Sequence, residues 1–351
     1  MQVIVLFNKF LSILFTLVIT VPTISSLQPQ TSAKSAVAMD GATRYVFYEK
    51  SKDNTLPIAS TTKIMTCLLA CESGKLDKIV KINKSMLESV EGTMIYLKAG
   101  DRISLYDLVQ GAMLASGNDA AKSIAVFLAG SEEKFCHIMN RRAVELGMKN
   151  TEFRSASGLD IGNHHSTAYD MALLAAEAVK NKIMVSISSR QSAYITVNGS
   201  KQKLFNHNKL LSYDSSYIGM KTGFTNKAGR CLVSAYKYKN NVIIVVTLND
   251  PQDWQDHKAL VEFAKRKYIT SAEQKEFSIA VVGGNTNSII AKCKYDLATI
   301  DSIDIKYCYY PILYAPVKVG DRVGKAVIYS GNKYIMTVVI TAEEEAQYYA
   351  Q

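Results

Sequence analysis

The sequence predicts an α+β fold in which an antiparallel sheet is flanked by helices, followed by a small all-β domain. Strand-like segments stand at both ends of the first 270 residues, with helical patterns between them, as in an α+β domain. Near Thr270 the pattern changes to short alternating runs separated by turns. A chain of 351 residues, 48% of them hydrophobic, is long enough to form two cores. We therefore expect one domain over 27–270 and a β-rich domain over 271–351.

The elements of the first domain follow one another in a regular order. Residues 36–40 and 44–48 flank a Gly-Ala turn and predict a β-hairpin. Apolar residues at helical spacing then predict several helices, some of which end at a glycine. The expected elements are helices from Ser60 to Gly74 and at 105–114, 120–128, 131–146 and 168–179, loops at 80–98 and 153–167, strands from 195 onward including 218–225, 230–238 and 242–248, and a last helix at 256–268.

The second domain is expected to be a sheet of short strands. Apolar and polar residues alternate within each run, and Gly- and Asn-containing turns separate the runs. Its many tyrosines are expected to cover the sheet. The expected strands are 277–282, 303–305, 324–329 and 334–340.

The net charge of +10 is scattered along the chain instead of forming a stripe. No nucleic-acid-binding motif accompanies it, so we expect no nucleic-acid partner. A basic surface would suit an anionic cell envelope or a carboxylate-bearing substrate, and it would also serve solubility alone.

The N-terminal segment is typical of a secretory signal peptide. Lys9 precedes an apolar run over 10–21, and small residues follow as far as Ser26. We expect 1–26 to be a signal peptide and the mature chain to act outside the cytoplasm, at the cell envelope. An uncleaved N-terminal anchor is the alternative.

The six cysteines could form disulfides outside the cytoplasm, but their spacing shows no framework. Cys67 and Cys71 lie one helical turn apart, which suits core packing, whereas Cys293 and Cys308 could pair across neighbouring strands. The chain has no Cys-x-x-Cys metal pattern, and no carboxylate spacing supports a metal at His164 and His165. We expect a polar-loop role for these histidines, and no metal or other cofactor.

The most informative stretch begins at Ser60, which lies three residues before Lys63 and directly before a long apolar helix. Residues three apart share a helix face, roughly 5–6 Å between their Cβ atoms, so the hydroxyl and the amine can meet. This arrangement suits a serine nucleophile with a lysine base. The lysine would have to lose its charge, and burial or a nearby cation lowers a lysine pKa from roughly 10.4. Ser-x-x-Lys also occurs at Ser131, which we interpret as a helix cap, and at Ser200, Ser234 and Ser330, so a helix cap remains the alternative for Ser60.

Two further motifs could join this pair. Ser116-Gly117-Asn118 interrupts two helical segments, where a hydroxyl and an amide can project into a cleft, although a capping loop is the alternative. Lys221-Thr222-Gly223 lies in a predicted strand, where the glycine would let a ligand approach the backbone. A solvent-facing strand lysine is the alternative there.

Together and in this order, the three motifs resemble those of serine acyltransferases that bind penicillin. The resemblance is to the low-molecular-mass penicillin-binding proteins that act as D-alanyl-D-alanine carboxypeptidases, and it covers about 36–341. It implies the fold shared by DD-peptidases and β-lactamases, with an α-helical subdomain and a C-terminal β-domain. The implied substrate is the peptidoglycan stem peptide, and β-lactams are the implied covalent inhibitors.

The resemblance also implies a role for each motif residue. Ser60 would attack the carbonyl between the last two D-alanines and form an acyl-ester, and Lys63 would take its proton. Ser116, with Lys221 nearby, would relay a proton to the leaving D-alanine.

Further residues are implied in substrate binding. Lys221 and Thr222 would hold the terminal carboxylate, Gly223 would let the ligand approach the backbone, and Asn118 would bind the peptide carbonyl. The backbone N–H groups of Ser60 and Phe224 would form the oxyanion hole.

One enzyme alternative, one non-enzyme alternative and one departure from the family accompany the resemblance. The chain shows no Glu-x-x-x-Asn element of class A β-lactamases between the second and third motifs, so rapid β-lactam hydrolysis is not expected. A non-catalytic cell-wall binding protein is the other alternative. Many relatives end in an amphipathic membrane-binding helix, whereas the short tail after 343–345 cannot supply one, which leaves membrane association open.

Overall fold

The computed structural model describes residues 28–349, so the predicted signal peptide lies outside the described residues. A five-stranded antiparallel sheet, in the order β2-β1-β9-β8-β7, organises the first domain. As predicted, strands from both ends of the first domain join this one sheet, which confirms the α+β class. Its strands are β1 (Ser35–Asp40), β2 (Val46–Lys50), β7 (Tyr217–Thr225), β8 (Gly229–Tyr238) and β9 (Asn241–Leu248).

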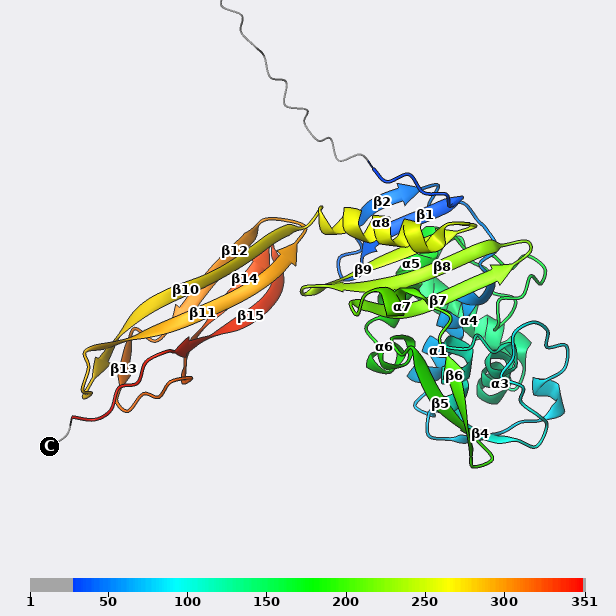
Figure 1. Ribbon diagram of the computed structural model, residues 1–351, viewed down its shortest axis with the longest axis horizontal. Helices are drawn as coiled ribbons and strands as arrows, with labels where there is room; N and C mark the ends of the chain where they lie inside the picture. The colour runs from blue at the N-terminus through cyan, green and yellow to red at the C-terminus, as the bar shows by residue number, and fades with distance from the viewer. Residues whose placement is uncertain (1–27, 350–351) are drawn as a thin grey trace, which may run out of the picture.

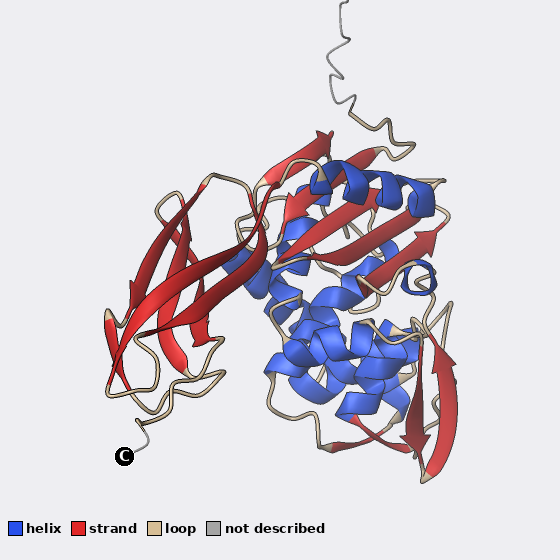
Figure 2. Ribbon diagram, turned by 60° about the vertical axis from the view of Figure 1, so that its left-hand side comes forward, coloured by secondary structure: helices blue, strands red, loops and turns tan. Residues whose placement is uncertain are grey.

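Helices cover both faces of this sheet (Figures 1 and 2). On β9, Ile244 and Val246 belong to the core formed with the central helices, while Ile243 and Val245 pack with α8 on the other face. This alternation follows from the period of two along a strand. Each fully buried aliphatic side chain contributes about 1.5–3 kcal/mol, so the sheet is held from both sides. The helices are α1 (Lys63–Glu72), α2 (Leu105–Met113), α3 (Asn118–Ala129), α4 (Glu132–Leu146), α5 (Ala168–Ala178), α6 (Lys182–Ser188), α7 (Leu210–Tyr213) and α8 (Asp253–Lys265).

Side-chain caps and left-handed glycines set several helix ends where the sequence predicted them. Ser131 Oγ accepts a hydrogen bond from Lys134 N at 3.2 Å and begins α4, as its helix-cap interpretation predicted. Gly130 and Gly147 end α3 and α4 with φ values of 84° and 82°. Glycine adopts this left-handed conformation without the penalty of a Cβ, which is why the helices stop there.

Some elements were missed or displaced in the prediction. Helix α6 was not predicted, although Asn181 caps it by accepting from Ile183 N and Met184 N. Helix α8 begins at Asp253, three residues earlier than expected. A small sheet in the order β3-β4-β5-β6 extends the helical part, and its strands are β3 (Ile79–Lys81), β4 (Arg102–Ser104), β5 (Ser192–Val197) and β6 (Ser200–Phe205).

The second domain is a six-stranded sheet, drawn in dark yellow, orange and red in Figure 1. The predicted runs are present, but β10 is longer than expected, and its main partner β11 was missed. At the junction with the first domain, Asn241 Nδ2 donates to Ala298 O at 2.6 Å, and Ala298 N donates to Asn240 Oδ1 at 2.9 Å. The strands are β10 (Ile269–Val282), β11 (Ser288–Thr299), β12 (Ile303–Tyr309), β13 (Ile312–Tyr314), β14 (Arg322–Ser330) and β15 (Lys333–Ala342).

The possible Cys293–Cys308 disulfide was wrong. Cys293 lies on β11 and Cys308 on β12, and two strands separate them in the sheet, so both thiols are free. Cys67 and Cys71 are buried in the core as expected. Within residues 28–349, no helix combines the length and the hydropathy that crossing a bilayer requires.

Candidate active site

Ser60 lies in a 3-10 turn, Ala59–Thr62, directly before α1. The turn is held by its own threonines, because Thr61 Oγ1 donates to Ile58 O at 2.6 Å and Thr62 Oγ1 donates to Ala59 O at 2.9 Å. Ala59 has a φ of +47°, which is uncommon for a residue with a Cβ and costs of order 1–3 kcal/mol. The surrounding structure must therefore hold the turn that presents Ser60.

Lys63 reaches back to Ser60 from the first turn of α1. Its Nζ lies 2.8 Å from Ser60 Oγ, 2.7 Å from Asn118 Oδ1 and 2.8 Å from Ser157 O. The side chain is fully buried, and this burial, together with the positive charge of Lys221, holds its pKa well below the usual range. The helix-cap alternative for Ser60 does not hold, because its hydroxyl contacts this amine and makes no capping bond.

The protonation state of Lys63 sets the direction of these contacts. A neutral amine has two N–H donors and one lone pair. Asn118 Oδ1 and Ser157 O can only accept, so they take both N–H groups. The lone pair is then left for the Ser60 hydroxyl, which is the geometry of a base facing its nucleophile.

The Ser116–Asn118 segment lies beside this pair, at the start of α3. Asn118 uses Oδ1 for Lys63, and its Nδ2 donates to Glu91 O at 2.6 Å. Asn118 therefore holds the lysine in place, and only its second Nδ2 hydrogen is left for another partner. Asp119 accepts from Ile95 N and Leu97 N, both at 3.0 Å, and ties the loop at 87–101 to this segment.

Strand β7 brings Lys221, Thr222 and Gly223 against the Ser60 turn. A Cβ on Gly223 would lie 3.0 Å from Ser60 N, so glycine allows the strand to approach the nucleophile this closely. Lys221 is 1% exposed, its Nζ donates to Thr222 O at 3.0 Å, and burial lowers its pKa to about 7. It is therefore not the solvent-facing strand lysine of the alternative interpretation.

A cavity of about 320 Å³ opens above these residues. Five of the eight predicted site residues line it, whereas Lys63, Asn118 and Lys221 are buried and are not among its lining residues. The lining residues are Ser60, Thr93, Ser116, His207, Lys209, Thr222, Gly223, Phe224, Arg230, Asp253 and Trp254.

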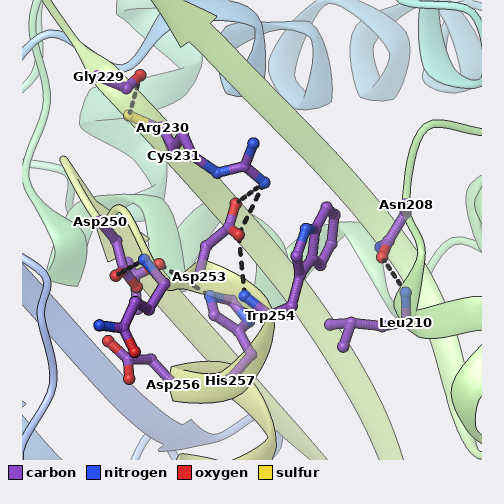
Figure 3. A network of polar contacts seen from close by, with 12 residues as sticks. Asn208, Leu210, Gly229, Arg230, Cys231, Asp250, Asp253, Trp254, Asp256 and His257 are labelled. Carbon is purple, nitrogen blue, oxygen red and sulfur yellow. Dashed lines mark hydrogen bonds and ion pairs between the residues drawn. The ribbon is translucent and has the colours of Figure 1, made fainter.

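The sequence prediction missed the basic and aromatic side of this cavity. Arg230 Nη2 lies 2.8 Å from both carboxylate oxygens of Asp253, and its guanidinium stacks over the Trp254 ring at 5.5 Å (Figure 3). His207 also lines the cavity, and desolvation and the charges of Lys221 and Lys63 lower its pKa. One signal was available, since Trp254 is the only tryptophan of the chain.

The expected polar-loop role of the paired histidines was wrong for His164. It lies in the predicted loop, but it is 4% exposed and contacts the Ser60 turn through Thr62 Oγ1, 2.8 Å from its Nε2. His165 does remain near the surface, where its Nδ1 lies 2.6 Å from Asn163 O. Their different environments depend on tertiary packing, which the adjacent positions in sequence did not reveal.

Two protein-family models together match residues 23–348 of the chain. Residues 23–252 match the family model of D-alanyl-D-alanine carboxypeptidase, and residues 251–348 match that of the penicillin-binding protein 5 C-terminal domain. The chain is 30% identical over 345 residues to the D-alanyl-D-alanine carboxypeptidase DacF of Bacillus subtilis (strain 168), covering 89% of this chain and 85% of that protein.

Solved structures agree in fold. The carboxypeptidase DacD from Francisella tularensis matches with a TM-score of 0.61 at 26% identity, over 92% of this chain and 95% of that one. Penicillin-binding protein 5 from Haemophilus influenzae matches with a TM-score of 0.63 at 26% identity, over 91% of this chain and 98% of that one. The chain therefore belongs to the family of D-alanyl-D-alanine carboxypeptidases, serine-type hydrolases that here carry a penicillin-binding protein 5 C-terminal domain.

Proposed function

We propose that this enzyme removes the terminal D-alanine from peptidoglycan pentapeptides through an acyl-enzyme on Ser60. The observation that carries the proposal is the 2.8 Å contact between Ser60 Oγ and the amine of Lys63, whose pKa burial holds well below its usual range. An uncharged amine can accept the hydroxyl proton as the oxygen attacks the carbonyl carbon. The enzyme is expected to act outside the cytoplasm, where this polymer lies.

The acylation step follows from the groups that face the cavity. Ser60 Oγ forms an ester bond to the acyl carbon, and its proton passes to Lys63. The bond to the last D-alanine breaks, and its nitrogen takes a proton through Ser116, which lines the cavity. Water then cleaves the ester and frees Ser60. The backbone N–H groups of Ser60 and Phe224 are proposed to bind the oxyanion, and losing one such donor costs about 100–1,000-fold in rate.

Substrate binding is proposed to use both sides of the cavity. Thr222 and the open backbone at Gly223 would receive the terminal carboxylate, and the second Nδ2 hydrogen of Asn118 would serve the peptide carbonyl. Because Lys221 is buried and is not among the lining residues, it would act on the carboxylate through its charge. Arg230 adds a cation that faces the cavity directly.

The test is mass spectrometry of the intact protein after penicillin, followed by mapping of the modified peptide. We expect one penicilloyl group, located on Ser60, and release of D-alanine from a pentapeptide. Ser60→Ala should abolish both. Ser200→Ala is the matched control, because Ser200 also precedes a lysine by three residues but lies exposed in the β5–β6 hairpin.

The other outcomes separate the alternatives. Rapid turnover of penicillin without a lasting label would identify a β-lactamase. Failure to acylate, with no D-alanine release, would leave a non-catalytic cell-wall binding protein. A label on a residue other than Ser60 would overturn the proposed chemistry.

A further inference from the structure

The loop at 152–165 lies directly against the turn that presents Ser60. Ser166, directly after the loop, pairs with Leu56, four residues before Ser60: Leu56 N donates to Ser166 O at 2.9 Å, and Ser166 N donates to Leu56 O at 3.1 Å. Within the loop, Gly158 packs so closely that an added Cβ would lie 1.9 Å from Ala59 O. The position of the Ser60 turn therefore depends on this loop.

One side chain of the loop, His164, connects to the turn by hydrogen bonds. Its Nδ1 accepts from Arg154 N at 3.0 Å, and its Nε2 lies 2.8 Å from Thr62 Oγ1. Because Nδ1 accepts a backbone N–H, the proton of the neutral ring must be on Nε2, which then donates to Thr62 Oγ1. Thr62 Oγ1 in turn donates to Ala59 O at 2.9 Å.

These contacts form one directional chain of three hydrogen bonds from Arg154 N to Ala59 O. The chain requires a neutral imidazole, since a protonated ring could not accept from Arg154 N. Burial, with the nearby His165, lowers the pKa of His164 to about 4, while Asp160 and Glu152 act in the opposite direction. The ring is thus neutral at pH 7, and it packs edge-on against Phe153, with 5.9 Å between centroids.

The chain of hydrogen bonds ends at Ala59, whose backbone conformation is strained. Ala59 immediately precedes Ser60 and holds a left-handed φ of +47°, a conformation that persists only when neighbouring contacts over-determine it. Rotation of this peptide would move Ser60 Oγ away from Lys63 Nζ.

We propose that His164 is a positioning residue for acylation, whose neutral imidazole ties the 152–165 loop to the turn that presents Ser60 to Lys63. This inference rests on the proposed function, since it concerns the step in which Ser60 is acylated. His164 does not touch the substrate, and it does not line the cavity that contains Ser60. Its contribution should appear in the rate of acylation and not in the affinity for the ligand.

Two variants of similar size separate the two hydrogen bonds of the ring. In His164→Gln, the amide nitrogen can reach the position of Nε2 and donate to Thr62, while the contact with Arg154 N is lost. In His164→Asn, the amide oxygen can accept from Arg154 N, but the side chain is too short to reach Thr62. His164→Phe keeps the ring volume and loses both hydrogen bonds.

The measurement is the acylation of Ser60 by penicillin, resolved into a dissociation constant for the reversible complex and a first-order acylation rate. We expect His164→Gln to stay within about threefold of wild type, and Asn and Phe to slow acylation by about 10–100-fold with an unchanged dissociation constant. Thermal unfolding of each variant is recorded beside it. Equal acylation rates in all variants, or losses that follow the melting temperature alone, would overturn the inference.

A second pair of variants tests the same chain from the other end and covers the case in which the His164 variants do not fold. Thr62→Ser keeps the hydroxyl, whereas Thr62→Val keeps the shape and removes it. We expect Val, and not Ser, to slow acylation, and Thr62→Val combined with His164→Asn to be no slower than the slower single variant. Additive losses would contradict a shared chain. If wild type itself is not acylated on Ser60, the proposed function fails, whereas an acylated wild type with insensitive variants refutes only the role of His164.

Discussion

Gly158→Ala changes the packing between the 152–165 loop and the turn that presents Ser60, without altering any group proposed to touch the substrate. The new Cβ would lie 1.9 Å from Ala59 O, 2.5 Å from Ala59 C and 2.8 Å from Thr62 Oγ1. Contacts of Cβ atoms below 3.0 Å are essentially never found, so the loop and the turn must separate by about 1 Å. The nearest neighbours are backbone atoms, which cannot rotate away as a flexible side chain would.

The expected cost has two parts. The backbone at Gly158 has a φ of +89°, which is strained for alanine by about 1–3 kcal/mol. Overpacking adds about 1–3 kcal/mol, so we expect the free energy of unfolding to fall by about 2–6 kcal/mol. A shift of about 1 Å in the turn that presents Ser60 should slow acylation by about 100-fold.

The assay combines urea unfolding with the first-order rate of Ser60 acylation by penicillin, at a temperature where the variant is folded. Gly162→Ala is the matched control, because Gly162 lies in the same loop with a φ of +55° and has no atom within 4 Å of an added Cβ. It should cost only about 1–2 kcal/mol of backbone strain and leave the acylation rate within twofold. If Gly158→Ala is acylated as fast as Gly162→Ala, the loop does not position the nucleophile turn, and the reasoning is refuted.

Three further results are expected. The buried Lys221 has a pKa of about 7 in the folded protein and 10.5 in the unfolded chain, so between these pH values folding releases its proton, and the free energy of unfolding should rise by up to about 1.4 kcal/mol per pH unit. In urea unfolding at several pH values, Lys221→Met should show a smaller rise with pH, and an unchanged rise would contradict the burial of Lys221. Asp119→Asn keeps only one side-chain oxygen acceptor, so Leu97 N loses its partner, and the free energy of unfolding in urea should fall by about 1–3 kcal/mol. No change would mean that other contacts hold the loop at 87–101. Arg230→Gln removes a cation from the cavity and should raise the KM for the pentapeptide about tenfold with little change in kcat, as measured by D-alanine release. A KM equal to that of wild type would place the substrate elsewhere. Quenching of the fluorescence of Trp254, the single tryptophan, on penicillin binding should report binding in the same cavity.

Local pattern was enough for most of the first domain. The apolar run at 242–248 predicted a strand, and β9 covers it, with side chains buried on both faces of the sheet. Ser131 and the glycines at 130 and 147 marked helix ends, because capping depends on a few adjacent residues. Helix α6 and strand β11 were missed, since a short helix or a strand of mixed polarity is stabilised mainly by what packs against it.

The candidate site divides in the same way. The three motifs named residues that the structure does bring together around Ser60. Nothing in their spacing indicated that Arg230 and Trp254 face the same cavity, because these residues come from β8 and α8. The buried position of His164 was equally hidden, since it depends on how the loop folds back onto the Ser60 turn.

Sequence alone determined the chemical types and their order: a serine three residues before a lysine at the start of an apolar helix, then Ser-Gly-Asn, then Lys-Thr-Gly, within an α+β chain. Only the tertiary structure decided that both lysines are shut away from water and which side chains meet the solvent of the cleft. The physical reason is that a lysine loses its charge through desolvation, and desolvation is created by segments tens to hundreds of residues away that close over it.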